Sequence, residues 1–200
     1  MRAPDPIEDA VAAALRGELI VFPTDTVYGI GALPDDSGAL ARIFEAKLRP
    51  RELTLPVLVP SAAEARELAA FDDRAERLAG RWWPGALTIV LPRSERSRGW
   101  DLGGATDTVG VRMPHDPMAL AVLAGTGPLA VTSANRSGDP TPTRCEELVE
   151  AFGDLVAVYL CRDEPFEGTP STVVDLAGEV PRLLREGAIP PRELELALFG

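Results

Sequence analysis

Two pairs of polar side chains, each with one residue between its members, are the part of this sequence that could do chemistry. Lys47 and Arg49 flank a leucine, and Ser133 and Asn135 flank an alanine. On extended backbone, residues two apart leave the chain on the same face, so each pair could present both groups to one ligand. An ammonium, a guanidinium, a hydroxyl and an amide suit an anion such as a phosphate or a carboxylate. For the Ser133 pair alone, a polar turn that binds nothing is an equally good interpretation.

The lysine of the first pair stands out because the chain contains nineteen arginines and a single lysine. Lys47 falls on the apolar row of a predicted helix, after Ile43 and Phe44, and so should face inward at the helix C-terminus. Pro50 ends that helix and favours an extended Arg49. We therefore expect an extended segment 47–49 whose two cations share a face. The alternative is that both cations only complement the helix dipole.

Further polar groups lie at the ends of other predicted strands, and they are hydroxyls and cations: Thr24, Thr26, Thr108, Arg112, Ser171, Thr172 and Arg185. Arg112 could bind a carboxylate or a phosphate through its fork, or simply pair with Asp116. The one histidine, His115, lies in a predicted turn, where we expect a structural role. These residues include few groups that could act in general acid–base catalysis. The set predicts catalysis by positioning and charge stabilisation, as in attack on a phosphate of ATP.

Short apolar runs and helical stripes alternate irregularly along the chain, which predicts one α/β domain with a mixed, twisted sheet. The expected strands cover residues 19–22, 55–59, 86–91, 108–112, 128–131, 155–160, 171–176 and 182–185. The expected helices cover residues 6–16, 37–47, 61–70, 72–83, 118–123 and 146–152, with a last one opening at Pro190.

Composition limits the class of protein. The chain is 46% hydrophobic and 26% charged, as in a globular protein, and no stretch approaches the length of an apolar membrane span. We expect a cytoplasmic protein. Its net charge of −11 argues against broad binding to nucleic acid or anionic membrane. Cys145 and Cys161 form no CxxC pair and have no neighbouring histidine, so we expect neither a zinc site nor a disulfide.

Several motifs together resemble the YrdC-like threonylcarbamoyl-AMP synthases, in their short, single-domain (TsaC-type) form. The segments 47–50 (KLRP) and 133–138 (SANRSG) resemble the KxR and SxN motifs of that family. The segments 23–29, 83–85, 111–114, 171–175 and 184–187 match further family motifs in family order. The resemblance spans residues 7–188 and implies a single YrdC-like domain over residues 1–200. It also implies a twisted mixed sheet, flanked by helices, around a central positively charged cavity.

The resemblance also implies a reaction, in which L-threonine, bicarbonate and ATP give threonylcarbamoyladenylate and pyrophosphate. Its catalytic tetrad would be Lys47, Arg49, Ser133 and Asn135. ATP would be held by Lys47, Arg49, Thr108, Asn135, Thr143 and Arg185. Threonine would be held by Thr26, Arg112, Ser133 and Ser171. Mg²⁺ would arrive with ATP and needs no protein cage.

The family's role implies partners as well. A tRNA threonylcarbamoyl transferase complex (TsaD/TsaB/TsaE type) would use the adenylate to modify an adenosine of tRNA beside the anticodon, with at most weak contact between this chain and tRNA. Some members carry an asparagine and a histidine where this chain has Leu53 and Leu58. Two other functions remain as alternatives: an RNA-binding module that uses the same cleft, and the carbamoyl-transfer domain of hydrogenase-maturation proteins.

Overall fold

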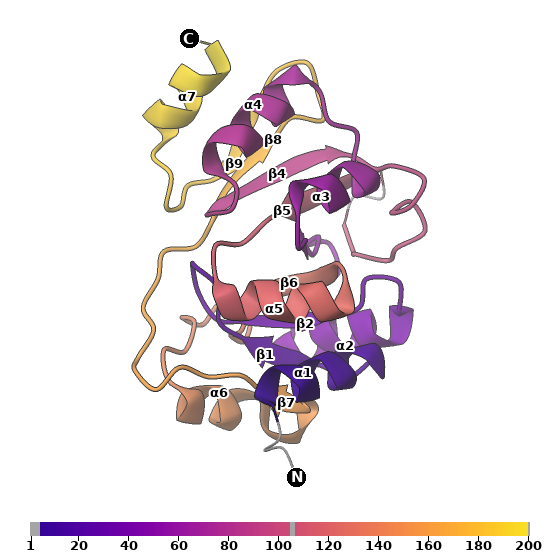
Figure 1. Ribbon diagram of the computed structural model, residues 1–200, viewed down its shortest axis with the longest axis vertical. Coiled ribbons are helices and arrows are strands. Elements are labelled where there is room, and N and C mark those ends of the chain that lie inside the picture. Colours follow the sequence, from indigo (N-terminus) through magenta and orange to yellow (C-terminus); the bar gives the residue numbers. More distant parts are fainter. Residues whose placement is uncertain (1–4, 105–106, 200) are drawn as a thin grey trace.

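In the computed structural model, which describes residues 5–104 and 107–199, helices pack on a large mixed sheet (Figure 1). The helices are α1 (Pro6–Leu15), α2 (Ser37–Lys47), α3 (Ala62–Leu68), α4 (Asp73–Trp82), α5 (Pro117–Thr126), α6 (Cys145–Phe152), the 3₁₀ turn η1 (Gly153–Leu155) and α7 (Pro191–Phe199). The strands are β1 (Ile20–Phe22), β2 (Gly29–Ala32), β3 (Val57–Leu58), β4 (Leu87–Pro92), β5 (Thr108–Arg112), β6 (Leu129–Ser133), β7 (Val158–Tyr159), β8 (Thr172–Asp175) and β9 (Arg182–Arg185).

Most helices begin at an acidic or hydroxyl side chain that accepts a hydrogen bond from the first turn. Asp5, Ser61, Asp72 and Asp116 cap α1, α3, α4 and α5 in this way. The sequence suggests Ser37 as the cap of α2, and this is wrong, because Ser37 is the first helical residue. The cap is Asp36, whose carboxylate accepts from the Ala39 N–H at 2.9 Å. A carboxylate also complements the positive end of the helix dipole, which a hydroxyl does less well.

The described strands form one sheet in the order β7-β1-β2-β6-β3-β5-β4-β8-β9. The pairs β1–β7, β3–β5 and β4–β8 are parallel and the other pairs are antiparallel, so the predicted mixed sheet is confirmed. The bounds of β5 and β9 agree with the sequence-based expectation. The strands β3 and β7 have two residues each and are shorter than expected. For β7, the reason is that the residues around Leu155 close a 3₁₀ turn instead of extending the strand.

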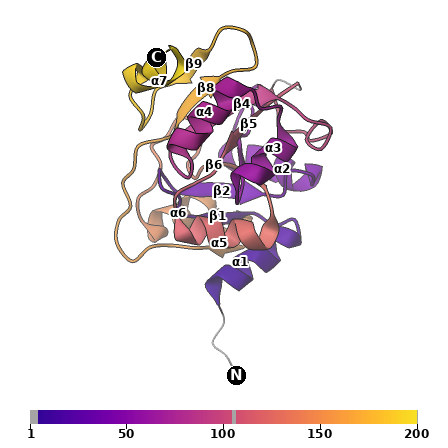
Figure 2. The ribbon, with the colours of Figure 1, turned by 45° about the horizontal axis from the view of Figure 1, so that its top comes forward.

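Two hydrophobic cores lie on opposite faces of the sheet, as the alternation within β1 shows. Ile20 and Phe22 pack with α1 and α5, whereas Val21 packs with the core that contains α2 and α4. Helices α1 and α5 run side by side over β1, β2 and β6 (Figures 1 and 2). No helix in the described part of the chain is long and apolar enough to span a membrane.

Candidate active site

A cavity of about 830 Å³ opens on the sheet where the cover of α1 and α5 ends. Leu58 and Val131 belong to the core under those helices and also line the cavity, so the two are continuous. Beyond Leu58 and Val131, the strands direct polar side chains into the cavity. In β4, Leu87, Ile89 and Leu91 enter the opposite core, while Thr88 and Val90 line the cavity. The cavity therefore lies on the same face of the sheet as α1 and α5, beside the core that these helices cover.

The same alternation places Arg112 in the cavity wall. In β5, Val109 and Val111 are core residues, and Thr108, Gly110 and Arg112 line the cavity. A Cβ added to Gly110 would lie 3.3 Å from the Thr88 side chain, so glycine keeps this part of the floor open. Strand periodicity therefore predicts which residues of β5 can reach a ligand.

Arg112 is nearly buried and is held from three sides. Its Nε donates to the Gly85 carbonyl at 3.0 Å, its Nη1 to Thr26 Oγ1 at 2.9 Å and its Nη2 to Asp25 Oδ1 at 2.5 Å. Burial lowers the pKa of Arg112, and the Asp25 carboxylate opposes that shift. The alternative of a pair between Arg112 and Asp116 is not observed, because Asp116 binds Arg162. Two N–H groups of the guanidinium remain for a ligand.

Lys47 contacts the turn that follows β6, whose residues Ser133 and Asn135 line the cavity. Its side chain is only 1% exposed, and its Nζ donates to the carbonyls of Ser133 and Asn135 and to Asn135 Oδ1, the last at 3.3 Å. Burial, followed by the charge of Arg49, lowers the pKa of Lys47 to about 7. The inward orientation inferred from the helical pattern is confirmed. Lys47 itself does not line the cavity.

The expected extended conformation of residues 47–49 is wrong, although Arg49 still reaches the cavity. Leu48 is the C-cap of α2, with a φ of 51° in the left-handed region, and the Arg49 N–H donates to the Phe44 carbonyl at 2.9 Å. The helix therefore closes with a tight left-handed cap before Pro50 can extend the chain. Leu48 is turned into solvent with 68% of its surface exposed.

Arg49 and Arg185 bring two guanidinium groups to the cavity from distant parts of the chain. Arg49 donates to the carbonyls of Leu53 and Thr54, and Arg185 donates to the carbonyl and hydroxyl of Ser171 at 2.8 to 3.0 Å. Burial lowers the pKa of both arginines, and the charge of Arg185 lowers the pKa of Arg49 further. An anion between the two would relieve this repulsion.

Most of the residues expected at the site do line this one cavity: Thr26, Arg49, Thr108, Arg112, Ser133, Asn135, Ser171 and Arg185. Thr143 lies in a smaller adjoining pocket of about 250 Å³ instead. Thr88 was missed by sequence reasoning. Its hydroxyl lies 2.9 Å from that of Ser171, and the strand alternation of β4 could have identified it. Leu53 and Leu58, the departures from the family pattern, both line the cavity.

The charge of the lining is mixed. It contains the arginines 49, 112, 182 and 185 and the carboxylates of Glu52, Asp107 and Asp175. Asp175 is itself paired with Arg182. Among the described residues, no group of three or more histidine, cysteine or acidic side chains could hold a metal ion. The lining thus has the donors for an anion, while a Mg²⁺ cage built from the described side chains is not present.

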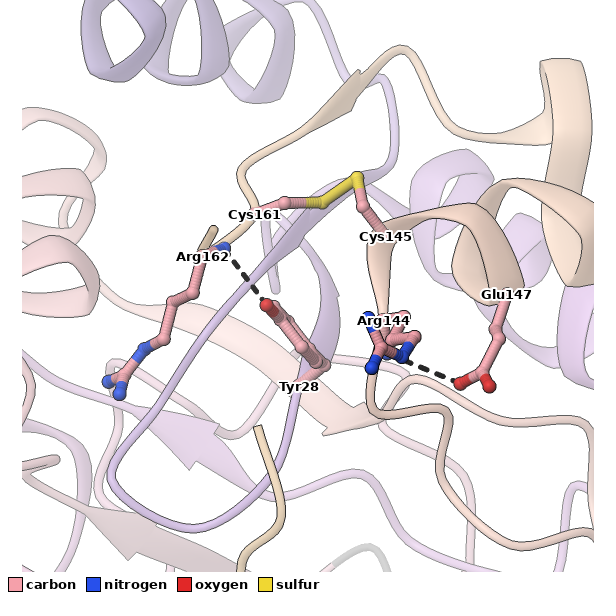
Figure 3. Close-up of a disulfide and its surroundings, with 6 residues drawn as sticks. All are labelled: Tyr28, Arg144, Cys145, Glu147, Cys161 and Arg162. Atoms are coloured by element: carbon pink, nitrogen blue, oxygen red, sulfur yellow. Dashed lines mark hydrogen bonds between the residues drawn. A yellow bond between two sulfur atoms is a disulfide. The ribbon is translucent and has the colours of Figure 1, made fainter. Parts of the chain in front are cut away.

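One expectation about the cysteines is wrong, because Cys145 and Cys161 form a disulfide (Figure 3). Their Cα atoms lie 5.7 Å apart, since β7 returns the chain to the first turn of α6. The two cysteines are 16 positions apart in the sequence, so no local spacing pattern indicates that they approach each other. Next to the bond, the Arg162 N–H donates to the Tyr28 hydroxyl at 2.9 Å (Figure 3). The disulfide therefore joins the first turn of α6 to the segment after β7, which contacts the cavity-lining Tyr28 through Arg162.

Known proteins share both the sequence and the fold. The family model Sua5_yciO_yrdC, described as "Telomere recombination", matches residues 12–187. A Mycobacterium tuberculosis protein is 45% identical over 92% of this chain and 84% of its own length. Proteins named threonylcarbamoyl-AMP synthase from Pyrococcus abyssi and Chromohalobacter salexigens are 43% and 36% identical, over 90% and 89% of this chain. This chain covers 53% of the former and 97% of the latter.

A solved structure has the same fold as this chain. P. abyssi Sua5, determined in complex with L-threonine, superposes with a TM-score of 0.89 at 39% sequence identity, over 99% of this chain. This chain spans 59% of that structure's length. The sheet and its flanking helices thus have the same fold as that protein.

Proposed function

Because this chain belongs to the Sua5/YciO/YrdC family, we propose that it is an L-threonylcarbamoyladenylate synthase. It would condense L-threonine, bicarbonate and ATP and release pyrophosphate. One observation carries the proposal: Lys47 of the KxR motif donates to the carbonyl of Ser133 of the SxN motif, 86 positions away. Arg49, Ser133 and Asn135 of these two motifs line the same cavity as Arg112. The match to the C. salexigens protein, which this chain covers over 97% of its length at 36% identity, supports this activity.

The chemistry would proceed by positioning. The threonine nitrogen combines with bicarbonate to give a carbamate and water. A carbamate oxygen then attacks the α-phosphorus of ATP, and the bond from that phosphorus to the bridging oxygen of pyrophosphate breaks. Arg49 and Arg185, whose positive charges repel each other, would stabilise the charge on the phosphates. No covalent enzyme intermediate is needed.

For threonine, we propose binding by Thr26, Arg112, Ser133 and Ser171. The two remaining N–H groups of Arg112 suit a carboxylate. Asp25, Thr26 and Gly85 fix the guanidinium beforehand, so that little order is lost on binding.

For ATP, we propose binding by Arg49, Thr108, Asn135, Thr143 and Arg185, with Lys47 contributing at the same wall. Thr143 in the adjoining pocket would place part of the nucleotide beyond the main cavity. Mg²⁺ would come with ATP, held mainly by phosphates and water, since this ion commonly uses only one or two protein ligands.

The wider setting is also part of the proposal. Residues 1–200 would form a single YrdC-like domain with its core at 7–188, located in the cytoplasm and supplying the adenylate to a tRNA threonylcarbamoyl transferase complex of the TsaD/TsaB/TsaE type. The comparisons do not favour an RNA-binding module or the carbamoyl transfer of hydrogenase maturation.

The test is product analysis. Incubation with ATP, bicarbonate and ¹³C-labelled L-threonine should give labelled threonylcarbamoyladenylate by mass spectrometry and an equal amount of pyrophosphate. Omission of any one substrate should abolish both. Arg49→Ala should reduce the rate about tenfold or more. Arg51→Ala, two residues away and paired with the exposed Asp101, is the matched control and should leave the rate unchanged. Wild-type protein that makes no adenylate would refute the proposal.

A further inference from the structure

Lys47 occupies a place in the fold that differs from that of the arginines around the cavity. Its Nζ is enclosed by the carbonyls of Ser133 and Asn135 and by Asn135 Oδ1. An ammonium has three N–H groups, and here three oxygens accept them. No N–H therefore remains for a phosphate, and the side chain is absent from the cavity lining.

The contacts of Lys47 extend along the whole turn after β6. The Lys47 carbonyl accepts a hydrogen bond from the Ser137 N–H at 2.8 Å, so the last residue of α2 holds the turn through both its side chain and its backbone. Asn135 is fixed in the same network. Its Oδ1 faces Lys47, and its Nδ2 donates to the carbonyls of Arg136 and Asp139 at 2.8 and 2.7 Å.

This network has an electrostatic consequence for the cavity wall. Carbonyl oxygens repel an anionic ligand. Those of Ser133 and Asn135, two residues that line the cavity, accept hydrogen bonds from the buried ammonium, which offsets their negative charge. We infer that Lys47 is a positioning residue, which acts on the nucleotide through the Ser133–Asn135 turn and does not itself contact the phosphates. This inference rests on the proposed function of the cavity.

Lysine suits this role better than arginine. Three oxygens converge on one atom, and an ammonium can donate to all three from a single nitrogen. A guanidinium distributes its donors over a planar fork and cannot do so in the same space. The geometry thus accounts for a lysine at this position in a chain that otherwise uses only arginine.

The single lysine permits a direct test on the wild-type protein. Reductive methylation with ¹³C-formaldehyde and a borane reductant can label only the α-amine and Lys47. If the turn encloses Nζ, only the α-amine reacts in the folded protein, with or without pyrophosphate, and Lys47 reacts once guanidinium unfolds the chain. Methylation of Lys47 in the folded protein, whether or not pyrophosphate blocks it, overturns the inference.

Variants supply a second, independent measurement. Lys47→Met should lower kcat about 100-fold or more, as for loss of an oriented catalytic group, with less than about a threefold change in the KM for ATP. Arg49→Met, which removes a guanidinium from the cavity lining, should instead raise that KM about tenfold. Lys47→Arg should not restore kcat. A Lys47→Arg enzyme with wild-type turnover, or a Lys47→Met enzyme altered mainly in KM, contradicts the inference.

The two proposals fail in different ways. Wild-type protein without adenylate synthesis would refute the proposed function, whatever the labelling shows. Methylation of Lys47 in an active, folded enzyme would refute only the positioning role. If Lys47→Met does not fold, as judged by circular dichroism, the labelling of the wild-type protein still decides the question.

Discussion

Replacement of Asp25 by asparagine tests the electrostatic support of Arg112. The two side chains are 14% and 6% exposed, and the Asp25 carboxylate accepts from Arg112 Nη2 at 2.5 Å. Asparagine keeps an oxygen in nearly the same place and removes only the charge. Loss of one partner of a buried pair costs about 3–5 kcal/mol, and the retained acceptor places Asp25→Asn near the lower end, at about 3 kcal/mol.

The assay is thermal unfolding followed by circular dichroism. For a chain of this size, about 3 kcal/mol corresponds to a fall in Tm of about 6–12 °C. The matched control is Asp101→Asn, because Asp101 pairs with Arg51 at 2.8 Å but both side chains are more than half exposed. That variant should lose no more than about 1 kcal/mol. Saturating L-threonine should recover part of the loss in Asp25→Asn, since its carboxylate can supply the missing charge.

Equal Tm values for the two variants would refute the reasoning, because burial is the difference on which it depends. A large loss in Asp25→Asn that threonine does not reduce would separate the two claims. That result would support the claim that the buried Asp25–Arg112 pair stabilises the fold. It would contradict the claim that Arg112 binds the carboxylate of the substrate.

Three further predictions concern other parts of the fold. Gly168→Ala should raise the KM for threonine and lower Tm, because the added Cβ would lie 1.4 Å from the Thr26 carbonyl oxygen; steady-state kinetics and unfolding check this. The pKa of Lys47 is about 7 in the folded chain and 10.5 without burial, so between these values the unfolded chain binds more protons. The free energy of unfolding should therefore rise with pH across that window, relative to Lys47→Met, in urea titrations. Reduction of the Cys145–Cys161 disulfide, which closes 16 residues, should cost about 3 kcal/mol, seen as a lower Tm in dithiothreitol. A Cys145→Ser variant that does not respond to dithiothreitol is the control.

Periodicity predicted the parts of the structure that are set by local pattern. The alternation of β5 placed Arg112 on the opposite face from Val109 and Val111, and the helical row of α2 placed Lys47 inward. Both results follow from the pitch of the element and the burial of its apolar side. The family resemblance then identified which of these polar residues should share a site, and most of them line one cavity.

Features that depend on distant segments could not be read from the sequence. Asp25 was not singled out, because its partner Arg112 is 87 residues away and no local pattern joins them. The disulfide was missed for the same reason. The left-handed cap at Leu48 was missed because a leucine there is disfavoured locally, and the packing of α2 against the turn after β6 determines it instead.

The position of β9 bears on how the cavity could empty. This strand is at the edge of the sheet, pairs with β8 alone, and its register shifts beside Val173. All four of its residues are exposed, and Arg182, Leu184 and Arg185 form part of the cavity lining. Detachment of this one strand would open the cavity on that side and withdraw two cations, while the central strands keep their hydrogen bonds. We therefore expect the β9 amides to exchange with deuterium sooner than those of β5, and a bound anion to slow them.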